Sequence, residues 1–282
     1  MRGAFFDIVR PFCRAEWMIN MKEMPVSYHR ILNRLERKEA RLLKQKGLSL
    51  PTEALEERIP PGIRSNLEKA FQKAFETMLG SGGTWVVEHT YQKGKTMERF
   101  RMWEQPLTPK QAKAELKRME RQGRNAQLLG RLAAGAEGTV LGVLGIGLPD
   151  IPVILALLLR SLYQSADRYG FSYHSPEERQ YLLLLLQGAL TQGEERLHYS
   201  READTLGRAL DHGWPIEVNV EETVASTSRC LARELLLVKF VQGIPLVGAV
   251  GGLSNLSISG RVARYGRIKY QKRFLEKKVR GL

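Results

Sequence analysis

Cysteine is scarce in this sequence of 282 residues, and its scarcity argues against two kinds of protein. Cys13 and Cys230 stand alone, without a CxxC pair or zinc-ligand spacing, so the pattern predicts neither a disulfide framework nor a zinc site. The first residues also lack the uninterrupted apolar run of a secretory signal, because Asp7, Arg10 and Pro11 divide them. We therefore expect reduced thiols and a cytoplasmic location.

The local signatures of common catalytic classes are also missing. The sequence contains no GxxxxGK[ST], HExxH or GxSxG motif, which argues against a P-loop nucleotidase, a zinc protease and a serine hydrolase. Glu195 and His198 form one ExxH arrangement, but a di-iron bundle needs two such pairs and two further carboxylates. We interpret this pair as part of a polar helix face. We expect no metal and no cofactor, and the sequence favours a protein without enzymatic activity over an enzyme.

Acidic residues are outnumbered, since 44 Lys and Arg face 30 Asp and Glu for a net charge of +14. The excess is uneven: residues 1–127 carry +10, residues 128–260 carry −4 and residues 261–282 carry +8. A basic protein is attracted to phosphate-bearing partners, which means nucleic acid or an anionic membrane surface. Because the acidic and apolar centre lies between two basic ends, we expect the membrane surface rather than nucleic acid.

Strand signals are weak, because the best β-branched run, residues 84–87, is too short to anchor a sheet. Helical periodicity, by contrast, covers residues 27–46 and 64–79. Hydroxyl N-caps followed by proline also predict helix starts near residues 109 and 176. Together these signals predict an all-α fold.

A Gly- and Pro-rich segment, residues 47–63, is the best candidate for a linker. It predicts a boundary between a separately mobile N-terminal helical arm, residues 1–60, and a compact helical domain, residues 61–282. No internal repeat of fixed period divides the chain further.

Long apolar runs are present only in interrupted form. Residues 138–159 hold one charge, Asp150, and two prolines divide the run into pieces too short to span the roughly 30 Å of a bilayer core. Residues 235–253 repeat the pattern with one proline. The sequence leaves open whether these two helical hairpins are buried in the protein or inserted shallowly in lipid. We expect close helix packing at their small residues, Gly138, Gly142, Gly145, Gly248 and Gly252.

Residues 257–280 predict a basic amphipathic C-terminal helix with an apolar stripe. Basic clusters beside an apolar element are attracted to anionic headgroups by about 1 kcal/mol per residue. Interleaved aromatic residues would also suit nucleic acid, and a solvated helix face is the third interpretation. The membrane interpretation assigns anionic-surface binding to Arg264, Arg267, Lys269, Lys272, Arg273, Lys277 and Lys278.

Three features follow one another in a fairly specific order: a glycine-rich hairpin with Asp-Ile-Pro, a Pro-Glu-Glu-Arg helix start, and a second glycine hairpin that leads into a basic helix. They lie in residues 142–160, 169–170, 175–179, 244–250, 255 and 261–263. Together they resemble the EcsC family of bacterial proteins, and the resemblance covers roughly residues 60–278. It implies association with the Ecs ABC transporter, which bears on protein secretion, membrane-protein processing and peptide export, and it implies no catalytic residue. Asp150, Asn255 and Arg261 match prominent motif positions and are candidate functional residues.

Three functional hypotheses follow. The leading one is a peripheral protein at the inner face of the cell membrane, an accessory that contacts the permease or ATPase of an Ecs-type ABC transporter. A lipid- or peptide-acting hydrolase with a site near Asp150 or His198 is the first alternative. A nucleic-acid-binding protein that acts through residues 261–280 is the second.

Overall fold

The computed structural model describes residues 26–44, 61–91, 93, 114, 151–241 and 251–280, and in these ranges every regular element is an α-helix. The all-α prediction is confirmed. Even the β-branched run 84–87 lies inside a helix. In chain order the helices are α3 (Val26–Leu43), α5 (Pro61–Leu79), α6 (Ser81–His89), α9 (Ile151–Arg168), α10 (Pro176–Leu190), α11 (Gly193–His212), α12 (Val220–Val241) and α13 (Gly251–Arg280).

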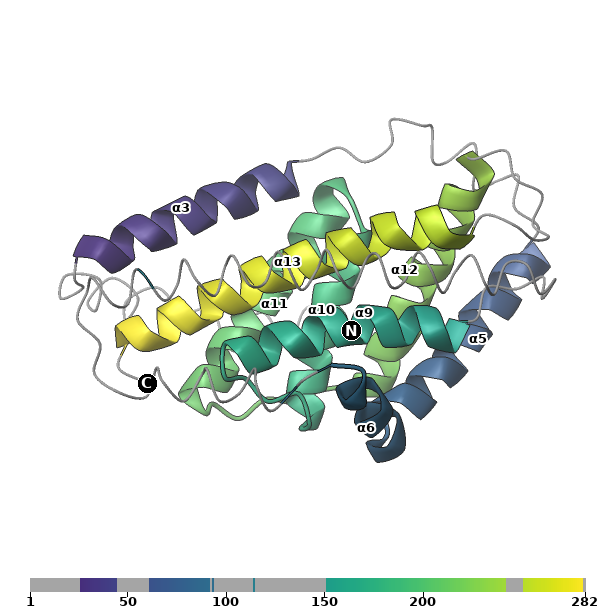
Figure 1. The fold of residues 1–282 in the computed structure, drawn as a ribbon, viewed down its shortest axis with the longest axis horizontal. Helices are drawn as coiled ribbons and strands as arrows, with labels where there is room; N and C mark the ends of the chain where they lie inside the picture. The colour runs from purple at the N-terminus through teal and green to yellow at the C-terminus, as the bar shows by residue number, and fades with distance from the viewer. Residues whose placement is uncertain are drawn as a thin grey trace.

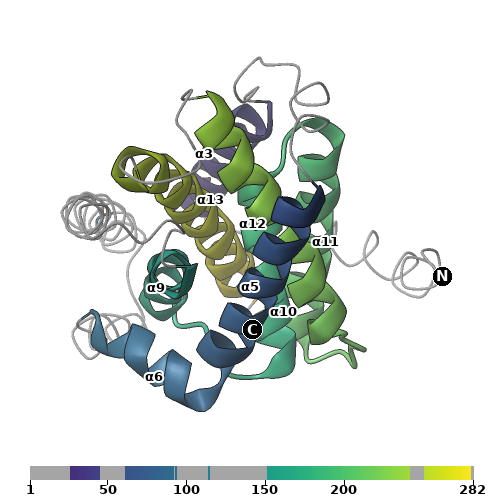
Figure 2. The same ribbon diagram turned by 90° about the vertical axis from the view of Figure 1, so that its right-hand side faces the viewer.

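Helix α13 is the axis of the fold (Figure 1). Helices α3, α9 and α10 pack along it, α11 and α12 touch it, and α5 joins α9 and α12. In the view of Figure 2, α9 lies on one side of α13, and α11 and α12 lie on the other. A helix that is covered from several directions must be apolar or internally neutralised around most of its circumference.

The core is densest at α10, where every residue from 181 to 190 is buried. This helix has no polar face along that stretch, which is expected of a helix enclosed by neighbours on all sides. The predicted periodicity in α5 is confirmed as well, since Leu67, Phe71 and Phe75 are all buried. Burial of each such side chain stabilises the fold by about 1.5–3 kcal/mol relative to its exposure.

The predicted capping signal at residue 175 is confirmed. Ser175 adopts an extended backbone, and its Oγ accepts a hydrogen bond from the amide of Glu178 at 3.3 Å. Pro176 follows at the first helical position, where its missing amide costs nothing. The other predicted start, near residue 109, lies outside the described residues.

Much of the two predicted glycine hairpins also lies outside the described residues. Gly138, Gly142, Gly145 and Gly248 fall there, while Gly252 lies in the first turn of α13. The described parts are α9, which follows the first hairpin turn, and the facing ends of α12 and α13. No helix within the described ranges is both long and apolar enough to cross a membrane.

Helix α3 belongs to the predicted N-terminal arm, and it is packed onto α11 and α13. Its buried side is formed by Leu32, Leu35, Glu39 and Leu42. Its last turn is also tied down, because Arg196 of α11 donates to the carbonyl of Leu42 at 3.0 Å. The boundary near residue 60 stays a prediction, since residues 45–60 are not among those described.

Candidate functional site

The basic residues of α13 require a correction, because this helix lies in the interior. Lys269 and Arg273 are 1% and 5% exposed, and Lys272 is half-buried. All three form ion pairs with carboxylates of neighbouring helices. Their charges are used inside the protein, so these three residues do not form the anionic-surface site that the sequence suggested.

Four of these charges form one buried group, the Lys269 network, which consists of Lys269, Lys272, Glu39 and Asp204. The Lys269 Nζ lies 2.5 Å from Glu39 Oε1 and 2.8 Å from Asp204 Oδ1. Lys272 Nζ lies 3.0 Å and 2.9 Å from the second oxygens of the same carboxylates. Lys269 also donates to Ser200 Oγ at 2.7 Å. The network therefore fastens α13 to α3 and α11 with two charges of each sign.

Opposite charges within the Lys269 network hold Lys269 and Asp204 in their charged forms. Burial by itself lowers the pKa of Lys269, but the nearby charges of Asp204 and Glu39 outweigh it and raise that pKa above its ordinary value. Burial would raise the pKa of Asp204, yet Lys269 and Lys272 lower it to about 2. Lys269 and Asp204 are therefore both charged at neutral pH.

Arg273 makes a second link between α13 and its neighbours. Its guanidinium binds Glu178 of α10 in a bidentate manner at 2.7 and 2.8 Å, and its Nε donates to Asp211 of α11 at 2.9 Å. The same group lies over the rings of Phe171 and Tyr181, 4.3 and 4.8 Å from their centroids. Planar stacking together with a bidentate pair is a geometry that only arginine provides.

The three candidate functional residues from the family motifs, Asp150, Asn255 and Arg261, are not brought together at one described site. Arg261 forms an ion pair with Glu234 of α12, whose side chain is 10% exposed, so it joins α13 to α12. Asn255 lies in the second turn of α13, and Asp150 lies outside the described residues. The remaining predicted surface residues stay candidates, because Arg264 and Lys278 are exposed and Arg267 and Lys277 are half-buried.

The exposed positive charge of the described chain is instead concentrated on α3. Five basic residues at helical spacing are exposed along the side that faces away from α13, and we call them the α3 basic stripe: Arg30, Arg34, Arg37, Arg41 and Lys44. At a rise of about 1.5 Å per residue, the stripe is about 21 Å long. The periodicity of residues 27–46 predicted the helix, and the alternation of leucine and arginine within it was the signal that could have identified the stripe.

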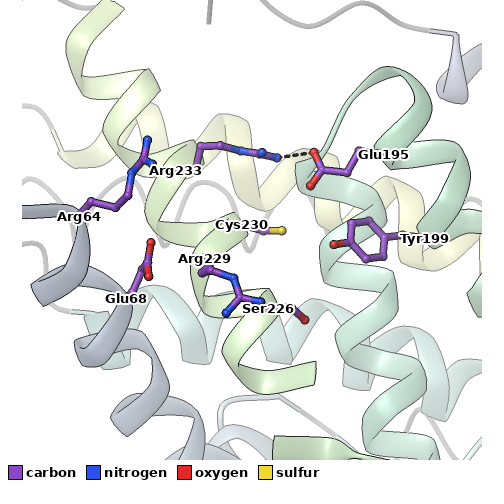
Figure 3. Close-up of a pocket in the computed structure, with 8 residues that line it drawn as sticks. All are labelled: Arg64, Glu68, Glu195, Tyr199, Ser226, Arg229, Cys230 and Arg233. Atoms are coloured by element: carbon purple, nitrogen blue, oxygen red, sulfur yellow. Dashed lines mark hydrogen bonds and ion pairs between the residues drawn. The ribbon is translucent and has the colours of Figure 1, made fainter. Parts of the chain in front are cut away.

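A hollow of about 220 Å³ lies between α5, α11 and α12, and we call it the arginine pocket (Figure 3). Its lining includes three arginines, two glutamates and one thiol. No motif marked these residues as one site, because they come from three separate parts of the chain. The lining consists of Arg64, Glu68, Glu195, Tyr199, Ser226, Arg229, Cys230 and Arg233.

The charges of the arginine pocket are partly matched within it. Arg233 pairs with Glu195, with 2.6 Å between Nη2 and Oε2. Arg229 is exposed, and no ion pair or hydrogen bond joins it to another residue of the described ranges. Cys230 points between α12 and α11, toward the Tyr199 hydroxyl (Figure 3). Burial, followed by the charge of Glu195, raises the pKa of this thiol to about 11, so it is neutral at physiological pH.

A cluster of two acids and two tyrosines joins α6 to the end of α9. Tyr91 donates to Asp167 Oδ2 at 2.5 Å, and Tyr173 donates to Glu88 Oε1 at 2.7 Å. Burial raises the pKa of Asp167 to about 6, even though the hydrogen bond from Tyr91 lowers it. Burial would also raise the pKa of Glu88, but hydrogen bonds from Lys93 and Tyr173 bring it below its ordinary value. Both carboxylates hold hydrogen bonds within the cluster, so we interpret it as a structural link.

The ExxH arrangement of α11 is divided between two ion pairs. Glu195 pairs with Arg233, whereas His198 lies 3.3 Å from Glu202 on the same helix. No group of three or more His, Cys, Asp or Glu within the described ranges could hold a metal ion. The interpretation of these residues as a polar helix face agrees with this geometry.

The structure thus defines an all-α domain whose central basic helix is neutralised by acidic side chains of the surrounding helices. The chain belongs to the EcsC protein family, because the model of that family matches residues 29–275. The match begins within α3, so it reaches further toward the N-terminus than the resemblance at residues 60–278 indicated. Protein EcsC of Bacillus subtilis (strain 168) is 25% identical over 146 residues, which cover 51% of this chain and 58% of that relative. No solved structure matches the chain.

Proposed function

We propose that this chain is a peripheral accessory protein that rests on an anionic membrane surface through the α3 basic stripe and serves an Ecs-type ABC transporter at the inner face of the cell membrane. The α3 basic stripe is the observation that supports the membrane part of the proposal most strongly. Membership of the EcsC family supports the transporter part.

The geometry of α3 suits a flat, negatively charged partner. Its buried side, with Leu32, Leu35 and Leu42, fixes the helix on the protein, so the opposite side keeps its orientation without a partner. Each basic residue near an anionic leaflet contributes about 1 kcal/mol, which gives about 5 kcal/mol for the five residues of the stripe at low salt. Helix α3 also lies at the edge of the molecule, where a plane can approach it (Figure 1).

The end of α13 also carries exposed positive charge. Helix α3 runs in the opposite direction to α13, so the beginning of α3 and the end of α13 lie at the same end of the molecule (Figure 1). Lys278 is exposed in the last turn of α13, at that end of the molecule. Lys278 stays a candidate for anionic-surface binding.

Flotation with lipid vesicles tests the membrane part. We expect the full chain to float with phosphatidylglycerol-containing vesicles at low salt, and less so at high salt because ions screen exposed charges. The variant R34Q/R37Q/R41Q should bind such vesicles at least tenfold more weakly, since three contacts of about 1 kcal/mol each are lost. A matched control, K69Q/K73Q/R201Q, removes three exposed basic residues outside α3 and should bind like the wild type.

Two outcomes would overturn the membrane part. One is an absence of binding by the wild-type chain, and the other is an equal loss in both triple variants, which would mean that net charge alone acts. Duplex DNA serves as a competitor in the same experiment. If DNA binds the stripe while vesicles do not, the nucleic-acid alternative replaces the proposal.

Co-purification from membranes tests the transporter part. We expect the tagged chain to retain the permease or ATPase of an Ecs-type transporter after detergent extraction, and a control protein of equal charge not to do so. The hydrolase alternative receives no support from the geometry, because His198 pairs with Glu202 and Asp150 lies outside the described residues.

A further inference from the structure

We propose that the arginine pocket binds a phosphate group. The pocket lies between α5, α11 and α12, none of which carries the α3 basic stripe. The inference is therefore independent of the proposed membrane contact, and it concerns a different site and a different ligand.

The size of the pocket limits the ligand. A hollow of about 220 Å³ equals the volume of roughly seven water molecules at about 30 Å³ each. That space accepts a phosphate with a short substituent, and it is below the 300–1,000 Å³ that pockets for drug-sized ligands usually have. The ligand is therefore a small anion or the headgroup of a larger molecule.

The charge of the pocket favours an anion. Three arginines against two glutamates leave one formal positive charge on its lining. Glu195 is already paired with Arg233, and the Cys230 thiol is neutral, so neither adds unpaired negative charge at the centre. Arg229 projects beside the hollow and has no ion pair or hydrogen bond to another described residue (Figure 3).

The arginines of the lining come from two helices. Arg64 comes from α5, whereas Arg229 and Arg233 come from α12. Guanidinium groups bind phosphate oxygens in pairs, and their planar shape makes them the preferred residues for this purpose. Because Arg233 is held by Glu195, the guanidinium of Arg229 is the group placed to receive a phosphate in the hollow.

Titration calorimetry with inorganic phosphate on the full chain, at constant ionic strength and without vesicles, tests the inference. We expect saturable binding that R229Q weakens at least tenfold. The control variant R201Q removes an exposed arginine of α11 that does not line the pocket, and it should bind like the wild type. Both replaced side chains are exposed, so neither variant disturbs the core.

A variant that is expected to increase phosphate affinity distinguishes loss of a binding contact from general disruption of the fold. Glu68→Gln removes a negative charge from the pocket lining and should tighten phosphate binding several-fold, which a merely disrupted fold would not do. An absence of saturable binding in the wild type would overturn the inference. Equal affinities in R229Q and R201Q would overturn it as well.

A second ligand identifies the source of the phosphate. Glycerophosphoglycerol, the soluble headgroup of phosphatidylglycerol, is titrated under the same conditions. Binding at least tenfold tighter than that of inorganic phosphate supports a lipid headgroup, and equal or weaker binding supports free phosphate. Failure of the wild-type chain to float with vesicles would leave this result unaffected. The titration uses no vesicles, and no residue of the α3 basic stripe lines the pocket.

Discussion

Replacement of Lys269 by methionine is the most direct test of the interior described above. The side chain of Lys269 is completely buried, and its ammonium lies 2.5 Å from Glu39 and 2.8 Å from Asp204. Methionine preserves much of the volume and removes the charge, so two carboxylates lose their closest partner. Removal of one member of a buried ion pair typically costs about 3–5 kcal/mol.

Lys272 reduces that cost, because its side chain, which is 15% exposed, also pairs with both carboxylates. We therefore expect K269M to lower the free energy of unfolding by about 3 kcal/mol, at the lower end of that range. The variant K272M, which removes the more exposed charge, should cost only about 1 kcal/mol. Urea unfolding followed by far-ultraviolet circular dichroism measures both values.

The reasoning also predicts a rescue. In the K269M background, E39Q removes one of the uncompensated carboxylates and should restore about 1–2 kcal/mol, whereas E39Q alone should be destabilising. Because the pKa of Asp204 is lowered to about 2, its contribution is present above pH 4 and is lost as the pH falls toward 2. A K269M variant within 0.5 kcal/mol of the wild type, or one more stable than K272M, would refute the argument.

Three further predictions concern single side chains. Asp167, with a pKa raised to about 6 by burial, should make stability fall by up to about 3 kcal/mol as the pH rises from 4 to 7, and Asp167→Asn should flatten that profile in urea titrations. The buried Tyr270 hydroxyl has no hydrogen-bond partner among the described residues, so Tyr270→Phe should raise the free energy of unfolding by about 1 kcal/mol, and a loss of stability would contradict this. Ser175→Ala removes the cap that receives the Glu178 amide and should cost about 1 kcal/mol in the same assay; no change would mean that the cap is not stabilising.

The sequence predicted those features that depend on neighbouring residues. The cap at Ser175 and the buried face of α5 both follow from residues three or four positions apart, which is the distance over which helix signals act. The all-α class followed from the same signals. These predictions needed no knowledge of what the helices pack against.

The role of the basic residues in α13 could not be predicted in this way. Lys272 and Glu39 are 233 positions apart, and nothing in the sequence near either residue indicates the other. A count of charges along residues 261–282 treats each one as exposed, whereas the fold places at least four of them, those of Arg261, Lys269, Lys272 and Arg273, against acids. The charge total was correct, and its location on the surface was not.

The arginine pocket shows the same limit for a candidate site. Its charged residues belong to α5, α11 and α12, and Arg64 is 165 positions away from Arg229. The sequence places Glu195 in an ExxH pair with His198, but in the structure Glu195 forms an ion pair with Arg233. A site assembled from single residues on separate helices has no local motif, so only the fold can reveal it.

The link between α3 and α13 has a consequence for how the protein folds. Helices α10 and α11 are adjacent in sequence and can pair early, but α3 must find α13 across a separation of more than two hundred residues. We therefore expect α3 to dock late, onto helices that are already assembled. Before α3 docks, the Lys269 ammonium lacks its ion pair with Glu39 and is accessible to solvent from the side that α3 will cover. Amine-reactive labelling during refolding should therefore modify Lys269 in the late intermediate and spare it in the native state. The rate at which Lys269 becomes protected then measures the rate at which α3 docks.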